Sequence, residues 1–199
     1  MKTKVITSEN DKIGVILYGC KIANNPLKLE NIYILQRLDS PDASSIKLFE
    51  SKIGNFSAEF GFAKDKKSQL FEALQICHQE FKAVEHQSYN KRIFLFTNEE
   101  DPGNEKEKAM AKQRASDLAS LGVDIVLFPL PKPDQAPQFN VKTFYADIIL
   151  YDDEEDMGEL LKVEGTQNRI GELMKRIRQK EFKKRVQGKC LFSITPKSQ

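Results

Sequence analysis

The order of apolar and polar residues after residue 67 most constrains the fold of this 199-residue chain. Segments 68–84 and 105–121 predict helices: the first has apolar residues at helical spacing, and the second is rich in charge and alanine. Segments 91–97 and 123–130 are short and largely apolar. Such strands are typical of parallel sheets that helices cover on both faces. The pattern predicts an α/β domain with a doubly wound, mainly parallel sheet.

The first third of the chain predicts an antiparallel pair of strands. Segments 12–20 and 31–38 are apolar, and an Asn-Asn-Pro turn lies between them. A helix is expected to follow, with Ser40 as its N-cap and Pro41 as its first residue. Segment 140–150 fits either a short helix or a strand, and its first part favours a helix.

The cysteines and histidines do not predict a metal site. Cys20, Cys77 and Cys190 are odd in number and widely spaced, which fits small buried hydrophobic residues better than zinc ligands. His78 and His86 have no third candidate ligand nearby in the sequence.

Charge is unevenly distributed near the end of the chain. An acidic block at 152–159 precedes basic residues between 169 and 189, which lie in a predicted amphipathic helix, 166–188. We therefore expect an α/β domain over 1–165 and a basic helix over 166–199. The net charge of +2 is too small to predict nucleic-acid binding by itself. No apolar run approaches the roughly 18 residues of a membrane span.

The strand at 91–97 runs directly into an oxygen-rich loop, "TNEEDPGN". Open α/β sheets bind ligands at the carboxyl ends of their strands, and hard cations prefer oxygen ligands. The alternative is a solvated loop, which the following Pro102-Gly103 favours.

Four stretches carry a family resemblance. "NIYILQRLDSPDA", "KRIFLFTNEEDPGN", "FNVKTFYADII" and "RIRQKEFKKR" occur in an order and spacing that resemble the smaller subunit of the Ku heterodimer, the ring-shaped protein that loads onto broken DNA ends. The similarity covers about residues 4–189. It implies an N-terminal von Willebrand A-like domain, followed by a basic helix that leads into the β-barrel around DNA.

The resemblance also implies that one strand is missing. In A-type domains the first strand is central, and in those that bind metal it ends in an Asp-x-Ser-x-Ser motif. This chain begins near the end of the family's first helix, so we expect an N-terminally incomplete chain that lacks the first central strand. The edges of 13–20 and 91–97 should then be unpaired.

Comparison with metal-binding A-type domains also argues against a metal site in the loop after 91–97. The closest sequence to the motif is "DASS" at 42–45, whose spacing is wrong. Asn98 stands where metal-binding A domains have an aspartate that helps order the site. We therefore expect no metal and no cofactor.

Two sets of residues are candidate contact sites. The resemblance places Lys183, Lys184, Arg185 and Lys189 near the start of the barrel, where they would meet the DNA backbone or the partner subunit. The alternative is a solvated helix face. Asp117, with Arg114 beside it on helix 105–121, matches an outward surface implicated in end joining, and the alternative is an exposed mixed-charge face.

No catalytic motif is present in the sequence. It contains neither phosphate-binding loop, G-x-x-x-x-G-K-[ST] or G-x-G-x-x-G, and no G-x-S-x-G. We therefore expect a protein that is not an enzyme, although the family is sometimes named a helicase. The family's lyase lysines cannot be transferred to Lys2 or Lys4.

The expected function is that of a scaffold domain in a nuclear Ku small subunit. The resemblance implies double-strand-break recognition, non-homologous end joining and telomere maintenance. The implied partners are the Ku large subunit, double-stranded DNA ends held by the full ring, and end-joining factors, with no membrane. The alternatives are a metal-dependent A domain that binds a protein ligand and, with less support, a small α/β enzyme.

Overall fold

The computed structural model of this chain describes residues 11–63, 69–84, 90–130 and 139–149, and residues 171, 174, 175, 177 and 178. The chain divides into two compact units, Met1–Leu150 and Tyr151–Gln199. The predicted boundary after residue 165 lies outside the described residues and stays a prediction. In the second unit, the five described residues are helical and lie within the predicted helix 166–188.

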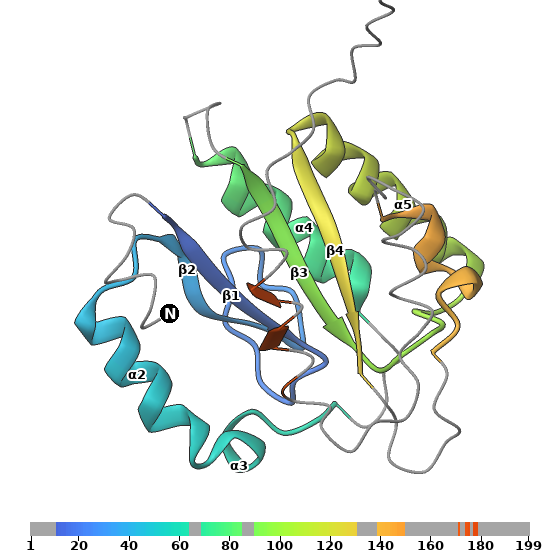
Figure 1. The fold of residues 1–199 in the computed structure, drawn as a ribbon. Helices are drawn as coiled ribbons and strands as arrows, with labels where there is room; N and C mark the ends of the chain where they lie inside the picture. The colour runs from blue at the N-terminus through green and yellow to red at the C-terminus, as the bar shows by residue number, and fades with distance from the viewer. Residues whose placement is uncertain are drawn as a thin grey trace, which may run out of the picture. The chain divides into compact units, whose positions relative to one another are not determined.

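All four predicted strands are present (Figure 1). β1 (Ile13–Tyr18) pairs with β2 (Ile32–Asp39) in antiparallel orientation. β3 (Lys91–Thr97) pairs with β4 (Val123–Pro129) in parallel, in an unbroken register. The α/β class is thus confirmed, with one parallel and one antiparallel pair among the described strands.

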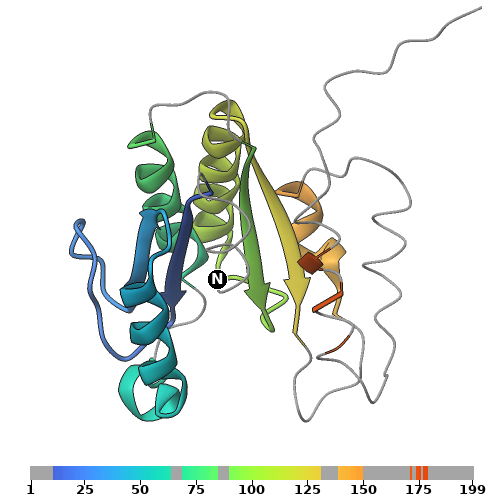
Figure 2. The same ribbon diagram turned by 60° about the vertical axis from the view of Figure 1, so that its left-hand side comes forward.

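The described strands do not form one continuous sheet. They make two two-stranded sheets, β1–β2 and β3–β4. β1 and β3 are neighbours in Figures 1 and 2, but no pairing joins them. The expectation that each of these two strands has an unpaired edge stays a prediction. Residues 1–10 lie outside the described part of the chain.

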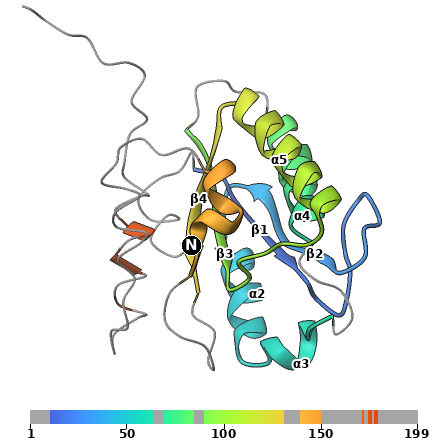
Figure 3. The same cartoon turned by 90° about the vertical axis from the view of Figure 1, so that its right-hand side faces the viewer.

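Helices cover both faces of the β1–β2 pair (Figures 2 and 3). On one face, Ala73 and Ile76 of α4 (Leu70–Lys82) pack against Ile32 and Ile34 of β2. On the other, Phe60 of α3 (Phe56–Phe60) packs with Leu35 and Cys20, and Phe49 of α2 (Ala43–Ile53) adds to them. The sequence did not predict α3.

α5 (Glu105–Ser120) lies beside α4 and packs against β4. It ends where the sequence predicts, since Gly122 has a φ of 73° and its amide bonds the carbonyl of Ala119. After β4, two 3-10 turns follow, η1 (Val141–Thr143) and η2 (Tyr145–Asp147). They occupy the part of 140–150 for which a short helix was favoured.

The predicted N-cap of α2 is wrong. Asp42, not Ser40, caps this helix, and its Oδ1 accepts a hydrogen bond of 2.7 Å from the Ser45 amide. The hydroxyls of Ser44 and Ser45 also donate to the Asp42 carboxylate. These hydrogen bonds lower the pKa of Asp42 to about 2. The Ser45 hydroxyl contributes most, followed by the Ser44 hydroxyl and then the Ser45 amide. The "DASS" sequence therefore serves as a helix cap.

Among the described residues, no helix has the length and apolar character needed to cross a membrane.

Candidate functional site

The candidate site is the loop between β3 and α5, at the carboxyl end of the parallel strands. β3 ends at Thr97 and β4 at Pro129, which are partners in the register, so both strands finish at the same edge. The loop that follows holds Glu99, Glu100 and Asp101 before α5 begins at Glu105. Ligands of open α/β sheets bind at this kind of position.

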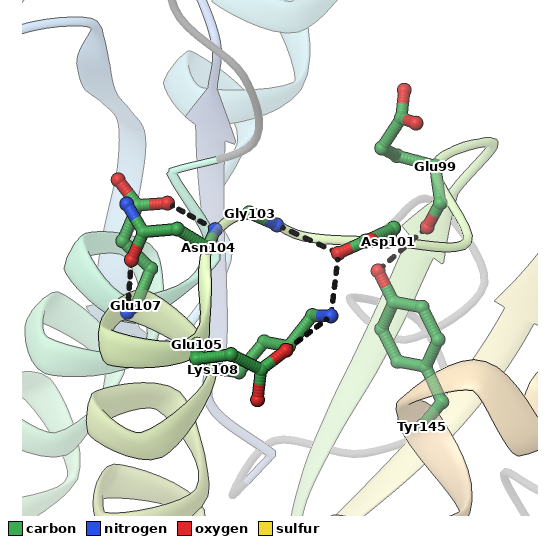
Figure 4. A network of polar contacts seen from close by, with 8 residues as sticks. All are labelled: Glu99, Asp101, Gly103, Asn104, Glu105, Glu107, Lys108 and Tyr145. Carbon is green, nitrogen blue, oxygen red and sulfur yellow. Dashed lines mark hydrogen bonds and ion pairs between the residues drawn. The ribbon is translucent and has the colours of Figure 1, made fainter.

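The last loop residue, Asn104, and Glu107 of α5 together cap the start of this helix (Figure 4). The Asn104 side chain accepts a bond of 3.0 Å from the Glu107 amide, and Glu107 Oε2 accepts one of 2.8 Å from the Asn104 amide. This reciprocal pair is a capping box. The carboxylate of Glu107 is therefore committed to the helix end.

A lysine balances the negative charge of Asp101. Lys108 Nζ lies 3.2 Å from Asp101 Oδ1 and 3.1 Å from Glu105 Oε1 (Figure 4). The Gly103 amide donates to the same Asp101 oxygen at 3.2 Å. Glu105 first, and then Asp101, raise the pKa of Lys108 above its usual value. An ammonium group thus stands where a cation would meet these two carboxylates.

A second polar cluster joins β1, β3 and η2 at the same edge. Tyr145 Oη donates to the carbonyl of Glu99 at 2.8 Å, and the Glu99 amide donates to Thr97 Oγ1 at 3.1 Å. Tyr18 Oη donates to the Phe96 carbonyl at 3.3 Å. Burial is the main cause that raises the pKa of both tyrosines. Both phenols therefore stay protonated and serve as donors to backbone carbonyls.

The geometry fits a self-contained structural loop better than a metal centre. Within the described ranges, no group of three or more His, Cys, Asp or Glu side chains is arranged to hold a metal ion. Asp101 already has Lys108, and the Glu99 carboxylate points away from Asp101 in Figure 4. No arrangement of a nucleophile and a base is present in this loop.

The predicted contact residues of α5 have structural partners. Arg114 Nη1 pairs with Asp117 Oδ2 at 2.9 Å, and the Arg114 guanidinium lies 5.9 Å from the ring centre of Phe71 on α4. Asp117 also accepts from Gln113 at 3.1 Å. Burial first, and then Arg114, lower the pKa of His78 on α4. Arg114 therefore helps hold α5 to α4, and Asp117 orients Arg114. Both residues are only partly exposed, and their role in binding stays a prediction.

The predicted DNA or partner contacts cannot be placed. Lys183, Lys184, Arg185 and Lys189 lie outside the described residues and stay predictions.

The polar contacts of Glu80 and Lys108 were not predicted from the sequence. Glu80 is a buried carboxylate whose oxygens accept from Arg37 Nη2 at 2.7 Å and from the Leu38 amide at 3.0 Å. Its position one helical turn beyond buried Ile76 was a signal that it lies inward. Lys108 could have been found from its spacing of three residues to Glu105.

Comparison with known proteins gives the family. Residues 1–187 match the Ku70/Ku80 N-terminal alpha/beta domain. The chain is 35% identical to X-ray repair cross-complementing protein 6 of Mus musculus, over 96% of this chain and 31% of that protein. It is 33% identical to ATP-dependent DNA helicase ku70 of Dictyostelium discoideum, over 96% of this chain and 22% of that protein. A rice relative, ATP-dependent DNA helicase 2 subunit KU70 of Oryza sativa subsp. japonica, is 28% identical over 98% of this chain and 33% of that protein.

The chain spans a third or less of the length of these relatives. The match nevertheless covers 187 of its 199 residues. The chain belongs to the Ku70/Ku80 N-terminal alpha/beta domain family.

Proposed function

We propose that this chain is the N-terminal domain of a Ku small subunit and acts as a scaffold in the recognition of DNA double-strand breaks. The observation that carries the proposal is the family match over residues 1–187, together with relatives named for X-ray repair and for ku70. The loop at the carboxyl end of β3 supports a role without chemistry, because Lys108 and the start of α5 engage its polar groups.

The finer fold assignment is a von Willebrand A-like domain. The parallel β3–β4 pair, and the α4 and α5 helices packed together beside it, are compatible with this fold. In the proposed heterodimer, the domain packs beside the ring of the complete proteins, helps hold the Ku large subunit and offers α5 to end-joining factors. Non-homologous end joining, telomere maintenance and a nuclear location follow from the same assignment.

DNA contact in this proposal is made by Lys183, Lys184, Arg185 and Lys189. Lysine and arginine that meet phosphates bind without sequence preference and release counterions. Removing the charge of one such side chain should therefore reduce the slope of log affinity against log salt by roughly 0.9.

The proposal excludes helicase activity in this chain, although several relatives carry that name. The sequence has no glycine-rich phosphate loop to bind ATP. The alternative function is a metal-dependent A domain that binds a protein ligand. The ammonium of Lys108 beside Asp101 argues against that alternative.

The test is co-expression of this chain with a Ku large subunit, followed by pull-down and by titration of blunt DNA ends at several salt concentrations. We expect a stable pair that binds ends, while the chain alone binds them weakly. A quadruple variant with glutamine at the four proposed DNA-binding positions should keep the pair and show a shallower salt dependence. Lys47→Gln with Lys106→Gln is the matched control, since both lysines are exposed and lie outside the basic helix.

Three results would contradict the proposal. The first is failure to capture the large subunit. The second is an unchanged salt slope in the quadruple variant, which would refute the DNA contacts alone. The third is protein-ligand binding that EDTA abolishes and magnesium restores, which would favour the metal-dependent alternative.

A further inference from the structure

The Ser40-Pro41 dipeptide is a sequence motif that the fold does not use. The sequence predicts it as the start of α2, but Asp42 caps that helix instead. The hydroxyls of Ser44 and Ser45 both donate to the Asp42 carboxylate and are therefore engaged. The Ser40 side chain is exposed, and its hydroxyl has no hydrogen-bond partner among the described residues. The Ser40 hydroxyl is thus accessible for reaction.

The backbone around Ser40 is already extended. β2 ends at Asp39, and the Ser40 amide donates to the Asp39 side chain at 2.8 Å. Proline disfavours the helical conformation in the residue before it, and Asp42 has a φ of −114° and a ψ of 177°. The first residue of α2 is Ala43. Residues 37–42 therefore form one extended run that leaves the outer strand of the β1–β2 pair.

An exposed serine in an extended run, followed directly by proline, has the form of a substrate of proline-directed protein kinases. Proline offers no amide donor, so the enzyme must accept a residue without one at this position. Arg37 lies three residues before Ser40, the spacing that arginine-directed kinases recognise. However, Glu80 Oε1 already binds the Arg37 guanidinium at 2.7 Å. Pro41 therefore selects the class of enzyme.

A lysine lies opposite Ser40. Ile13 pairs with Asp39, so continuation of the antiparallel register places Lys12 opposite Ser40 and on the same face. The Lys12 side chain is exposed and has no ion-pair partner within the described ranges. The other charged groups of this region lie on the opposite face or at α2: Asp11, Arg37, Asp39, Asp42 and Lys47. A phosphate on Ser40 is repelled by Asp42 but attracted by Lys12 and by the amino end of α2.

We propose that Ser40 is a phosphorylation site of a proline-directed protein kinase, and that its phosphate pairs with Lys12 across the start of β1. ATP donates its γ-phosphoryl group: the bond from the γ-phosphorus to the oxygen that stays with ADP breaks, and a bond from phosphorus to Ser40 Oγ forms. The hydroxyl proton passes to a carboxylate base of the kinase. The new contact ties the start of β1 to the connection between β2 and α2. This inference goes beyond the proposed scaffold function and does not depend on it.

The test incubates the full 199-residue chain with ATP and a purified mitogen-activated protein kinase, a proline-directed enzyme. Mass spectrometry of the digested chain is expected to place the phosphate on Ser40. Ser40→Ala should abolish this signal. Pro41→Ala should slow phosphorylation about tenfold or more, since it removes the side chain that the kinase pocket selects.

Ile32→Ala shows whether the folded chain is the substrate. This variant opens a cavity in the core of the β1–β2 pair and raises the unfolded fraction, but it leaves residues 37–42 unchanged. If the kinase acts on the folded chain, the rate should change by less than about twofold. A rate that rises in proportion to the unfolded fraction would overturn the proposal.

Phosphorus-31 NMR tests the contact with Lys12. The second pKa of phosphoserine is ordinarily about 6. Lys12 favours the dianion and lowers this pKa, so Lys12→Gln should raise it by about 0.2–0.7 unit. Lys47→Gln removes another exposed lysine, on α2, and is the matched control. It should change the pKa of the phosphate by less than about 0.1 unit.

Three further outcomes would contradict the proposal. Phosphate on other hydroxyls but not on Ser40 would refute the site. Faster phosphorylation of Ser40 by an arginine-directed kinase would refute the class of enzyme. An equal pKa of the phosphate in the wild type and in Lys12→Gln would refute the contact with Lys12.

Discussion

The two inner strands, β1 and β3, are less buried than the outer strands, β2 and β4. No residue of β1 is fully buried, and only Leu95 and Thr97 are buried in β3. β2 and β4 instead contain many buried side chains, among them Ile32 at 0% and Leu127 at 1% exposure. In a continuous sheet the order is the reverse, because outer strands have one unpaired edge. The apolar sequences of β1 and β3 fit the prediction that each strand has a second neighbour, which stays a prediction because residues 1–10 lie outside the described part of the chain.

The largest effect is expected when an isoleucine is changed to alanine in each strand of the β1–β2 pair. Ile32→Ala in β2 removes a side chain enclosed by Ile34, Ala73 and Ile76, and should lower the free energy of unfolding by about 2–5 kcal/mol. Ile16→Ala in β1 touches the same cluster from a half-buried position and should cost about 1–2 kcal/mol. Urea unfolding followed by circular dichroism measures both. Equal costs would mean that Ile16 is as enclosed as Ile32 in solution, and the comparison would be wrong.

The outer strand β2 also has a polar contact with a helix, of a kind that β1 lacks among the described contacts. Glu80 of α4 accepts from Arg37 and from the Leu38 amide. Glu80→Ala leaves that amide without its acceptor and should destabilise the fold by about 1–3 kcal/mol.

Arg37→Ala is the matched control for Glu80, because the Arg37 side chain is 66% exposed. Its cost should be no more than about 1 kcal/mol. If the two variants were equally destabilised in urea, the ion pair rather than the amide bond would anchor β2.

The sequence predicted the elements better than their contacts. The strands follow from short apolar runs, α4 from apolar residues at helical spacing, and α5 from its charge and alanine content. All three signals depend only on near neighbours. The cap at Asp42 and the short α3 depend on small differences between local hydrogen bonds, so Ser40 was a reasonable but wrong N-cap. The contact of Glu80 with Leu38 joins residues 42 positions apart, and that of Tyr18 with Phe96 joins residues 78 apart. No local pattern encodes such pairs.

The stability of the fold at alkaline pH tests the tyrosine contacts of the inner strands. Burial raises the pKa of Tyr18 and Tyr145 above the unfolded value of 10.0. Their contribution to stability is therefore fully present below pH 10 and is lost as the pH rises above the unfolded pKa toward the folded values. Tyr18→Phe and Tyr145→Phe should each reduce the loss of stability between neutral pH and pH values above 10. At neutral pH, Tyr18→Phe should cost about 0.5–1.5 kcal/mol, the value of one hydrogen bond.

Urea midpoints at a series of pH values measure this effect. If the double variant lost stability above pH 10 as steeply as the wild type does, other groups would control alkaline unfolding. The two phenols would then not be the contacts that hold the inner strands and η2 together.

The smallest expected effect concerns Lys108, which balances charge beyond the carboxyl end of the inner strand β3. Lys108→Gln removes the ammonium from Asp101 and Glu105 but leaves the capping box of Asn104 and Glu107 in place. We expect a decrease in Tm smaller than that of either tyrosine variant. Because two carboxylates then lose the Lys108 ammonium, millimolar calcium should raise the Tm of the variant but not that of the wild type. Lys106→Gln, an exposed lysine on the same helix, is the control and should respond as the wild type does. A calcium response in the wild type would mean that Lys108 does not satisfy this loop, and that the carboxyl end of β3 can hold a metal after all.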